Sequence, residues 1–400
     1  MNLMHPLLSS KYGCWVSLPS KKLFASKLDA VRYASQTGQS VYFYYHDHIW
    51  DNFDRTLLGK IPLTTLYKER AQQLRDKYDH LVLHYSGGAD SHNILHTFLT
   101  NNIKLDEICV KWPKPLRDGK FYTPNNTDTS ARNAVSEWDF AIKPTLDWLA
   151  SNRPDIKITI IDYASNLSQQ LTSVSHIETR ILSMPISRGG LASLAWWVDP
   201  TIEDNISQKK ISNTGHIFGV DKPILLLKDN NICVQFMDVV FDTSLMPVAN
   251  SEGRVEGFYW TPDFPILALE QAYQTALVIK QNKEFLSLIE TSSALTTADI
   301  LKRFEDQGNL QKKILYKDSW NLNTFQADKP NVARSDWYFW LFENQELASL
   351  KNNWVQASNN LLQGVDQQLL LTTSVDQLSV PFIKPVRTKP FPILAMHSGL

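Results

Sequence analysis

Short apolar runs alternate with helix-like stretches through the middle of the chain. The apolar runs cover residues 81–85, 107–112, 157–163 and 216–219. Continuous apolar runs are typical of strands that are buried on both faces of a sheet. Strands that alternate with helices imply right-handed crossovers and a parallel sheet. The pattern therefore predicts an α/β domain built on a doubly wound parallel sheet.

The chain before this domain has the pattern of a small α+β segment. Extended runs at residues 14–18 and 40–45 flank a helix-like stretch that Gly38 ends. An amphipathic helix is predicted over residues 62–78, because its apolar positions recur with a period close to 3.6 residues. We expect a β-rich lead-in over residues 1–60, followed by the helix that opens the α/β domain.

The chain after the parallel strands changes character. Two apolar runs, at residues 223–227 and 232–236, predict a hairpin that finishes the α/β domain. Helical patterns follow at residues 264–280, 284–290, 296–305 and, with breaks, 335–371. The tail, 380–400, carries prolines and basic residues without an acid, so we expect it to run extended along the surface. The expected domains are a lead-in, an α/β domain and a helical C-terminal region with an extended tail, at 1–60, 61–290 and 291–400.

Composition limits the partners and the compartment. Lys and Arg number 40 against 41 Asp and Glu, so the chain lacks the basic excess of proteins that bind nucleic acid. Its three cysteines include no C-x-x-C pair, which argues against a disulfide scaffold or a thiolate metal centre and favours a reducing compartment. We find no signal sequence and no apolar run of the roughly 18 residues that a membrane span needs. We expect a cytoplasmic protein without a membrane partner.

One segment combines residues suited to holding phosphate. The predicted strand at 81–85 runs into a turn and then a helix, with the sequence Ser86-Gly87-Gly88-Ala89-Asp90-Ser91. The two glycines permit a tight turn and leave backbone N–H groups exposed to an anion. The positive end of the helix points to the same place, and the two serine hydroxyls add donors. Asp90 suits a bridging Mg²⁺ ion, since its own charge repels phosphate.

These residues resemble a known signature. The pattern S-G-G-x-D-S is that of the PP-loop ATP pyrophosphatase superfamily, which has the adenine nucleotide α-hydrolase (HUP-like) fold. The resemblance implies ATP and Mg²⁺ as cofactors, with the loop binding the β and γ phosphates and ATP cleaved between its α and β phosphates. The loop has no G-K-[ST] sequence, which argues against transfer of the γ phosphate. A glycine turn without a ligand is the alternative interpretation.

A second match lies at the end of a later strand. The sequence Gly219-Val220-Asp221-Lys222 resembles the G-x-D-E segment of asparagine synthetase C-terminal domains. The resemblance implies that Asp221 is a second Mg²⁺ ligand. Lys222 stands where that branch usually has glutamate, and it could contact a phosphate oxygen or balance the carboxylate. A turn that opens the hairpin is the alternative. Residues 258–263 add a similarity to asparagine-synthetase-like proteins of large tailed phages.

Two further groups complete the expected site. Ligands of doubly wound sheets lie beyond the carboxyl ends of the strands, so we expect the backbone from Val110 to Trp112 to lie near the adenine. The resemblance also implies a lysine from the C-terminal region near the α phosphate. The sequence does not choose among its three candidates, which are Lys312, Lys313 and Lys329.

Two histidine groups suggest metal chemistry only weakly. His46, Asp47 and His48, with Asp51 and Asp54 nearby, could share a strand face, but an ordinary polar turn is the favoured interpretation. The pair His92 and His96 lacks the glutamate of an H-E-x-x-H motif, so contact of His92 with phosphate is favoured over zinc.

Together the motifs and the resemblance predict an ATP-dependent adenylating ligase. A carboxylate or amide-type oxygen of a small-molecule substrate would attack the α phosphorus, and ammonia or an amine would then displace AMP. The chain begins Met1-Asn2 and lacks the N-terminal cysteine of a glutamine-hydrolysing enzyme, so nitrogen would come from free ammonia, a separate glutaminase or an amine. The alternatives are a regulatory module that binds ATP without turnover, and a PP-loop enzyme that modifies tRNA or a nucleobase, although the neutral charge disfavours RNA.

Overall fold

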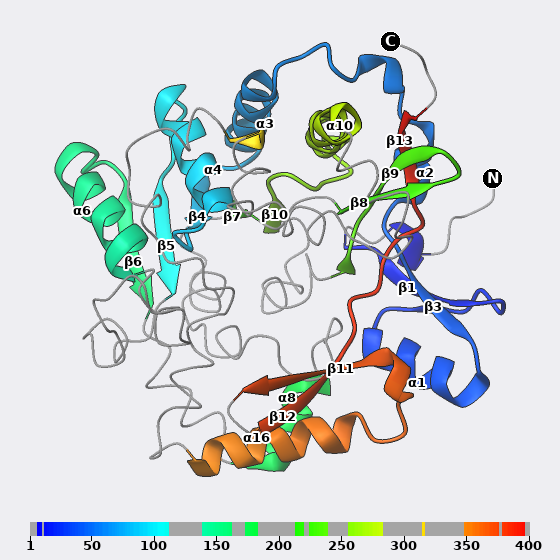
Figure 1. Cartoon of the computed structure of the whole chain (residues 1–400). Coiled ribbons are helices and arrows are strands. Elements are labelled where there is room, and N and C mark those ends of the chain that lie inside the picture. Colours follow the sequence, from blue (N-terminus) through cyan, green and yellow to red (C-terminus); the bar gives the residue numbers. More distant parts are fainter. Residues whose placement is uncertain are drawn as a thin grey trace.

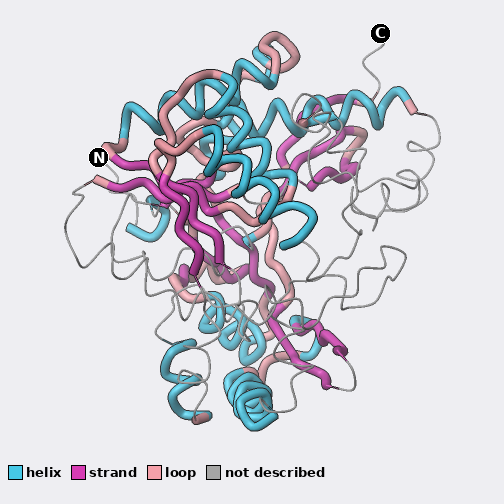
Figure 2. The backbone as a smooth tube through the Cα atoms, turned by 90° about the vertical axis from the view of Figure 1, so that its left-hand side faces the viewer, coloured by secondary structure: helices cyan, strands magenta, loops and turns pink. Residues whose placement is uncertain are grey.

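The computed structural model describes ten stretches of the chain, and all structural statements below concern them. They are residues 6–9, 12–111, 138–161, 173–182, 213–219, 224–238, 255–282, 314–316, 348–375 and 378–396. Figure 1 shows a central sheet with its helices in the upper part and a second group of elements at the bottom. Figure 2, seen from the side, also shows helices gathered at the bottom, apart from those beside the strands.

Five parallel strands form the largest sheet. They are β4 (His80–His84), β5 (Glu107–Lys111), β6 (Lys157–Ile161), β7 (Thr214–Phe218) and β10 (Val255–Gly257). Their order is β10-β7-β4-β5-β6, and every neighbouring pair is parallel. The chain adds strands on one side of β4 and then returns to add β7 and β10 on the other. This doubly wound α/β arrangement confirms the predicted class and is compatible with a Rossmann-like fold.

The two faces of this sheet pack against apolar clusters of different size. Leu81 and Leu83 face the main core, whereas Val82 joins a small separate cluster with Cys109 and Ile161. All five residues of β7 and four of the five in β4 are buried, as predicted for strands covered on both faces. The prediction is wrong for β6, where Ile160 is 38% exposed, because β6 is the edge strand and no strand follows it.

Helices cover the sheet and position its loops. Helix α3 packs against α4 and α10, and both α3 and α4 contact β4. Helix α3 confirms the predicted amphipathic helix, because its face carrying Leu66, Ala71 and Leu74 is buried. The helices of this part are α3 (Leu63–Lys77), α4 (Ala89–Thr100), α6 (Lys143–Asn152) and α10 (Pro265–Gln281). Short helical turns are η1 (Pro6–Ser9), η2 (Arg55–Leu57), η4 (Trp138–Ile142) and η9 (Gln367–Leu369).

The lead-in forms a three-stranded antiparallel sheet with one helix. Its elements are β1 (Cys14–Leu18), β2 (Leu23–Phe24), α1 (Lys27–Thr37), β3 (Ser40–Tyr44) and the short α2 (Asp47–Asn52). The side chain of Ser26 caps the start of α1 by accepting from the backbone of Asp29. Gly38 ends α1 in the left-handed conformation, as its sequence position predicts.

The predicted hairpin is present but does not finish the α/β domain. Strands β8 (Ile224–Lys228) and β9 (Asn231–Gln235) pair antiparallel around Asp229 and Asn230. Both turn residues have positive φ, as in the two-residue turns that match strand twist. The prediction of a domain end is wrong because β10 follows the hairpin and completes the parallel sheet. Only three residues of β10 pair, too few for a recognisable pattern.

The C-terminal region contains more strand than predicted. Its elements are α16 (Ala348–Leu361), β11 (Leu370–Val375), β12 (Leu378–Ile383) and β13 (Phe391–Ala395), and α16 packs on α8 (Val174–Leu182). The predicted helix over 335–371 is wrong at its end, because Gly364 takes a positive φ and the β-branched residues that follow favour a strand. The predicted helices at 284–290 and 296–305 lie outside the described residues.

The tail is extended, as predicted, but it is not confined to the surface. Strand β13 pairs with β9 and makes the hairpin a three-stranded sheet. Ile383 and Phe391 are each at most 1% exposed, because alternate residues of an extended segment point to opposite sides and one side here faces the core. No helix within the described residues is long and apolar enough to cross a membrane.

Candidate functional site

The segment 86–91 lies where the chain changes winding direction. It follows β4, whose neighbours are β5 on one side and β7 on the other. The backbone N–H of Tyr85 donates to Cys109 O at 2.9 Å, which holds the start of the loop to β5. Arrowheads of β5 and β6 in Figure 1 point down toward the second group of elements. Doubly wound sheets bind ligands at this switch point, beyond the carboxyl ends of their strands.

Hydrogen bonds within the loop fix its shape. Ser91 Oγ donates to Gly88 O at 3.1 Å and accepts from the backbone N–H of Ser86 at 3.2 Å. The side chain of Ser91 is only 2% exposed, so it shapes the loop from inside. Ser86 is exposed, and its hydroxyl also accepts from the backbone N–H of Gly88. Gly87 has φ +77°, a conformation that glycine adopts without strain.

The end of β7 lies directly against this loop. A Cβ atom on Gly219 would come within 3.0 Å of Ser91 N and 3.1 Å of the Asp90 carbonyl carbon. Glycine therefore lets the two backbones approach this closely, whereas any larger residue would push them apart. The structure thus brings together the first residue of the second motif and the loop of the first. Asp221 and Lys222 lie outside the described residues.

The residues present fit a phosphate and a divalent cation. Helix α4 begins at Ala89, and the first N–H groups of a helix have no partner within it. Asp90, Ser86 and Ser91 offer only oxygen atoms, which Mg²⁺ prefers over nitrogen and sulfur. Groups of three or more metal-ligating side chains are absent among the described residues. Mg²⁺ commonly takes one or two carboxylates and completes its shell with substrate phosphates and water, so a single described carboxylate is compatible with it.

Two buried tyrosines donate hydrogen bonds to Asp90 and a third lies beside them, and the sequence analysis missed all three. Tyr316 donates its hydroxyl proton to Asp90 Oδ1 at 2.5 Å, and Tyr259 donates to the Asp90 carbonyl at 2.8 Å. Tyr67 lies beside both, with its ring 5.9 Å from that of Tyr259. Burial is the main cause that raises the pKa of all three phenols, and the charge of Asp90 raises each further. The hydroxyls therefore stay protonated and act as neutral donors.

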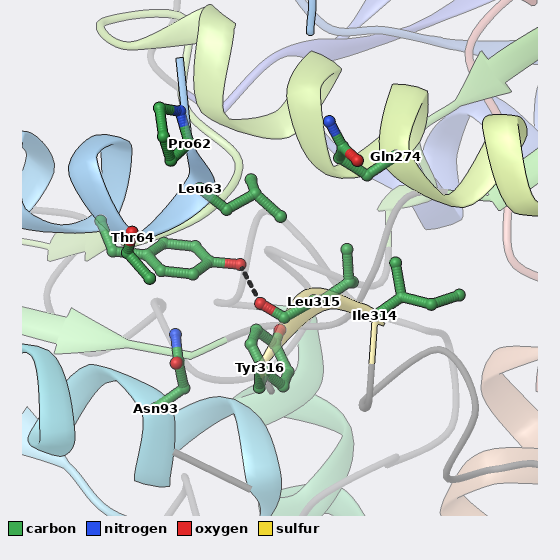
Figure 3. A pocket seen from close by; sticks show the side chains of 9 residues that line it. Pro62, Leu63, Thr64, Asn93, Gln274, Ile314, Leu315 and Tyr316 are labelled. Atoms are coloured by element: carbon green, nitrogen blue, oxygen red, sulfur yellow. Dashed lines mark hydrogen bonds between the residues drawn. The ribbon is translucent and has the colours of Figure 1, made fainter. Parts of the chain in front are cut away.

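A cavity of about 320 Å³ lies next to these tyrosines. Its walls come from α3, α4, α10 and residues 314–316, and Figure 3 shows Asn93 and Thr64 across from Leu315 and Tyr316. Tyr67 donates to Leu315 O at 2.9 Å, the bond drawn as a dashed line. The volume of this cavity falls at the lower end of the range for small-molecule sites.

His92 presents an acceptor rather than a donor. Thr145 Oγ1 donates its only proton to Ala141 O at 2.8 Å, so Tyr85 OH donates to Thr145 and accepts from His92 Nδ1, each at 3.1 Å. His92 Nε2 therefore carries a lone pair, and it makes no hydrogen bond to any described residue. Burial, then the neighbouring His96, lowers the pKa of His92 to about 4. The contact of His92 with phosphate stays a prediction, and in it Nε2 is the free ring nitrogen.

The remaining predicted site residues have mixed outcomes. Val110 is fully buried in the core, so only its backbone could meet a ligand. Trp112 and the three candidate lysines, Lys312, Lys313 and Lys329, lie outside the described residues. The polar turn favoured for residues 46–48 is confirmed, and the alternative of a shared strand face is wrong. Strand β3 ends at Tyr44, His46 takes a positive φ of 51°, and Asp47 begins α2, so the segment is a polar turn into a helix.

No family model matches the chain, and no curated protein matches it either. The fold and the loop define an α/β protein with a glycine-rich turn at the switch point of a doubly wound sheet.

Proposed function

We propose that the chain is an ATP-dependent adenylating enzyme related to the asparagine synthetase branch of the PP-loop superfamily. The observation that supports this best is the position of the S-G-G-x-D-S segment. It lies between a parallel strand and a helix at the switch point of the sheet, with Gly219 packed against it. An anion-binding turn is most useful at this place, because helix and strand ends converge on the ligand there.

The residues would divide the work as follows. The turn at 86–88 and the first turn of α4 bind phosphate oxygens through backbone N–H groups. Asp90 binds Mg²⁺, which when present neutralises charge on the pyrophosphate that leaves. Asp221 is the proposed second carboxylate and Lys222 a phosphate contact. The backbone from Val110 to Trp112 is the proposed adenine neighbour.

The proposed chemistry has two steps. An oxygen of a carboxylate or amide-type acceptor attacks the α phosphorus of ATP, and the bond to the bridging oxygen breaks, which releases pyrophosphate. Ammonia or an amine then attacks the activated carbon, a carbon–nitrogen bond forms, AMP leaves, and the nitrogen loses a proton to water. Holding the acceptor and the phosphate in line accounts for much of such a rate enhancement. The proposed acceptor is a small molecule with a carboxylate or amide-type oxygen, and the proposed nitrogen donor is ammonia or an amine. The proposed compartment is the cytoplasm.

An exchange assay tests this proposal directly. The chain is incubated with Mg-ATP, labelled pyrophosphate and pools of carboxylic acids, and label that enters ATP is measured. We expect exchange that depends on one acid pool, since adenylation is reversible. A thermal shift with Mg-ATP but no exchange with any acid would favour the regulatory module. Exchange that requires RNA would favour a tRNA-modifying enzyme, and no nucleotide binding at all would contradict every nucleotide-based function.

A further inference from the structure

Tyr316 reaches Asp90 from a distant part of the chain. The two residues are 226 positions apart, yet the phenol hydroxyl lies 2.5 Å from Oδ1 of the carboxylate. Tyr316 is only 2% exposed, whereas Asp90 is partly exposed. Hydrogen bonds to ionised acceptors are short and strong. This bond therefore restricts the rotation of the Asp90 side chain at the start of α4.

The segment that carries Tyr316 is itself held in place. The Tyr67 hydroxyl on α3 donates to the carbonyl of Leu315 at 2.9 Å. The amide of Gln271 on α10 donates to the same hydroxyl at 3.1 Å. The ring of Tyr316 also packs on that of Tyr259, with centroids 5.7 Å apart. Tyr316 thus links the orientation of the Asp90 carboxylate to helices α3 and α10.

Asp90 is also fixed at its backbone. Tyr259 OH donates to the Asp90 carbonyl at 2.8 Å and accepts from Asn93 Nδ2 at 3.1 Å. One tyrosine therefore fixes the main chain of Asp90, while Tyr316 fixes its side chain. Removing the Tyr316 hydroxyl alone would leave the bond from Tyr259 to the loop backbone in place and take one hydrogen bond from the carboxylate.

We propose that Tyr316 is a positioning residue that orients the Asp90 carboxylate for the Mg²⁺ of bound Mg-ATP. The proposal rests on the proposed function, because it requires a cation at Asp90. Groups that hydrogen-bond a metal ligand typically change metal affinity by 10–100-fold when removed. Tyr316 would thereby make cation binding at the loop depend on residues 314–316 being docked.

The first test replaces Tyr316 by phenylalanine, which keeps the ring. Mn²⁺ stands in for Mg²⁺, and its dissociation constant is measured by electron paramagnetic resonance with an ATP analogue that cannot be cleaved between its α and β phosphates. We expect Tyr316→Phe to bind Mn²⁺ about tenfold more weakly. Tyr45→Phe is the matched control, because Tyr45 is equally buried and its hydroxyl donates to Trp260 O. The control should bind Mn²⁺ as the unmodified protein does.

Chemical rescue provides the second test. Tyr316→Ala opens space next to the 320 Å³ cavity that Tyr316 lines. We expect phenol to restore Mn²⁺ affinity in this variant and benzene not to, because only phenol can donate to Asp90. Equal rescue by both would mean that Tyr316 acts by packing alone, and would overturn the proposal.

The outcomes separate this proposal from the proposed function. Tight Mn²⁺ binding by the unmodified protein, with equal or tighter binding by Tyr316→Phe, overturns the positioning role and leaves the nucleotide function standing. Failure of the unmodified protein to bind Mn²⁺ with the analogue overturns both.

Discussion

The amino ends of the parallel strands form one edge of the five-stranded sheet, here called the amino edge, and their carboxyl ends form the opposite, carboxyl edge. The two edges hold their carboxylates by opposite means. At the amino edge, Glu107 is 3% exposed and contacts Lys157 at 3.1 Å and His80 at 3.3 Å. The neighbouring Asp106 pairs with Arg75 and Lys104. At the carboxyl edge, Asp90 is held by the neutral hydroxyl of Tyr316.

This difference teaches how the two edges serve the molecule. Burial would raise the pKa of Glu107, but hydrogen bonds from His80, Thr159 and Lys157 outweigh it and lower the pKa to about 2. The amino edge is therefore organised by charge pairs that stabilise the fold. The carboxyl edge is organised by glycines and hydroxyls around one carboxylate. Substitutions at the two edges should separate stability from ligand binding.

The largest expected effect is at the carboxyl edge. Asp90→Asn should lower the rate of ATP–pyrophosphate exchange by roughly 100-fold or more, because the charged ligand proposed for the Mg²⁺ of Mg-ATP is lost. The free energy of unfolding should change by less than about 1 kcal/mol, since asparagine can still accept from Tyr316. Asp147→Asn, an exposed carboxylate on α6, is the control and should change neither. Normal exchange in Asp90→Asn would refute the site assignment.

A smaller effect is expected at the amino edge. Glu107→Gln should lower the free energy of unfolding by about 2 kcal/mol, because hydrogen bonds to a charged group are lost. Nucleotide affinity should be unchanged. Urea unfolding and calorimetric titration with Mg-ATP measure the two quantities. Asp155→Asn, whose partner Arg153 is on the surface, is the matched control. Loss of nucleotide binding in Glu107→Gln would contradict the proposal that the amino edge serves stability and the carboxyl edge serves ligand binding.

The two edges should also titrate in different pH ranges. The pKa of His92 near the loop is about 4 against an ordinary value of 6.5. The unfolded chain therefore binds a proton first, and stability should fall as the pH drops from about 6.5 to 4. Glu107 has a lowered pKa, so its contribution is lost later, from about 4.5 to 2.

Urea unfolding at a series of pH values separates these ranges. His92→Asn should flatten the upper range only, and Glu107→Gln the lower range only. If His92→Asn left the slope between pH 6.5 and 4 unchanged, the buried neutral histidine would be contradicted.

The smallest expected effect on the free energy of unfolding is at the exposed ion pair between Lys104 and Asp106. Lys104 is 69% exposed where it pairs with Asp106, whereas Arg75 is 16% exposed. Lys104→Ala should change the free energy of unfolding by less than about 0.5 kcal/mol, since exposed ion pairs contribute little. Arg75→Ala should cost more, because Arg75 also donates to the carbonyl of Tyr78. Equal costs, measured by urea unfolding, would mean that burial does not rank these pairs.

Local patterns predicted the elements whose causes are local. The period of α3, the Gly38 end of α1 and the turn at Asp229 each depend on residues within a few positions of one another. The strand before the loop and the helix after it were also predicted from the sequence, because the glycines and Asp90 lie in one short segment. These parts include the loop that supports the proposed function.

The missed features depend on residues that are far apart in the chain. Tyr316 contacts Asp90 across 226 positions, and nothing in residues 314–316 marks the tyrosine as a partner of the loop. Strand β13 pairs with β9, so the proline-rich tail is part of a sheet. A single sequence contains no signal for such pairings, because they arise from the packing of elements that are already formed.

Asp238 has a consequence for how the chain folds during synthesis. Its carboxylate pairs with Lys27 at 2.8 Å, accepts from Trp15 Nε1 at 2.8 Å and accepts from the backbone N–H of Val386 at 3.0 Å. Both charged groups are 1% exposed. Val386 follows Asp238 by 148 residues, so this buried cluster can close only after the chain has been synthesised past Val386. Trp15 and Lys27 are synthesised well before Asp238 and Val386, so their part of the lead-in lacks these buried contacts in the interval, which favours aggregation.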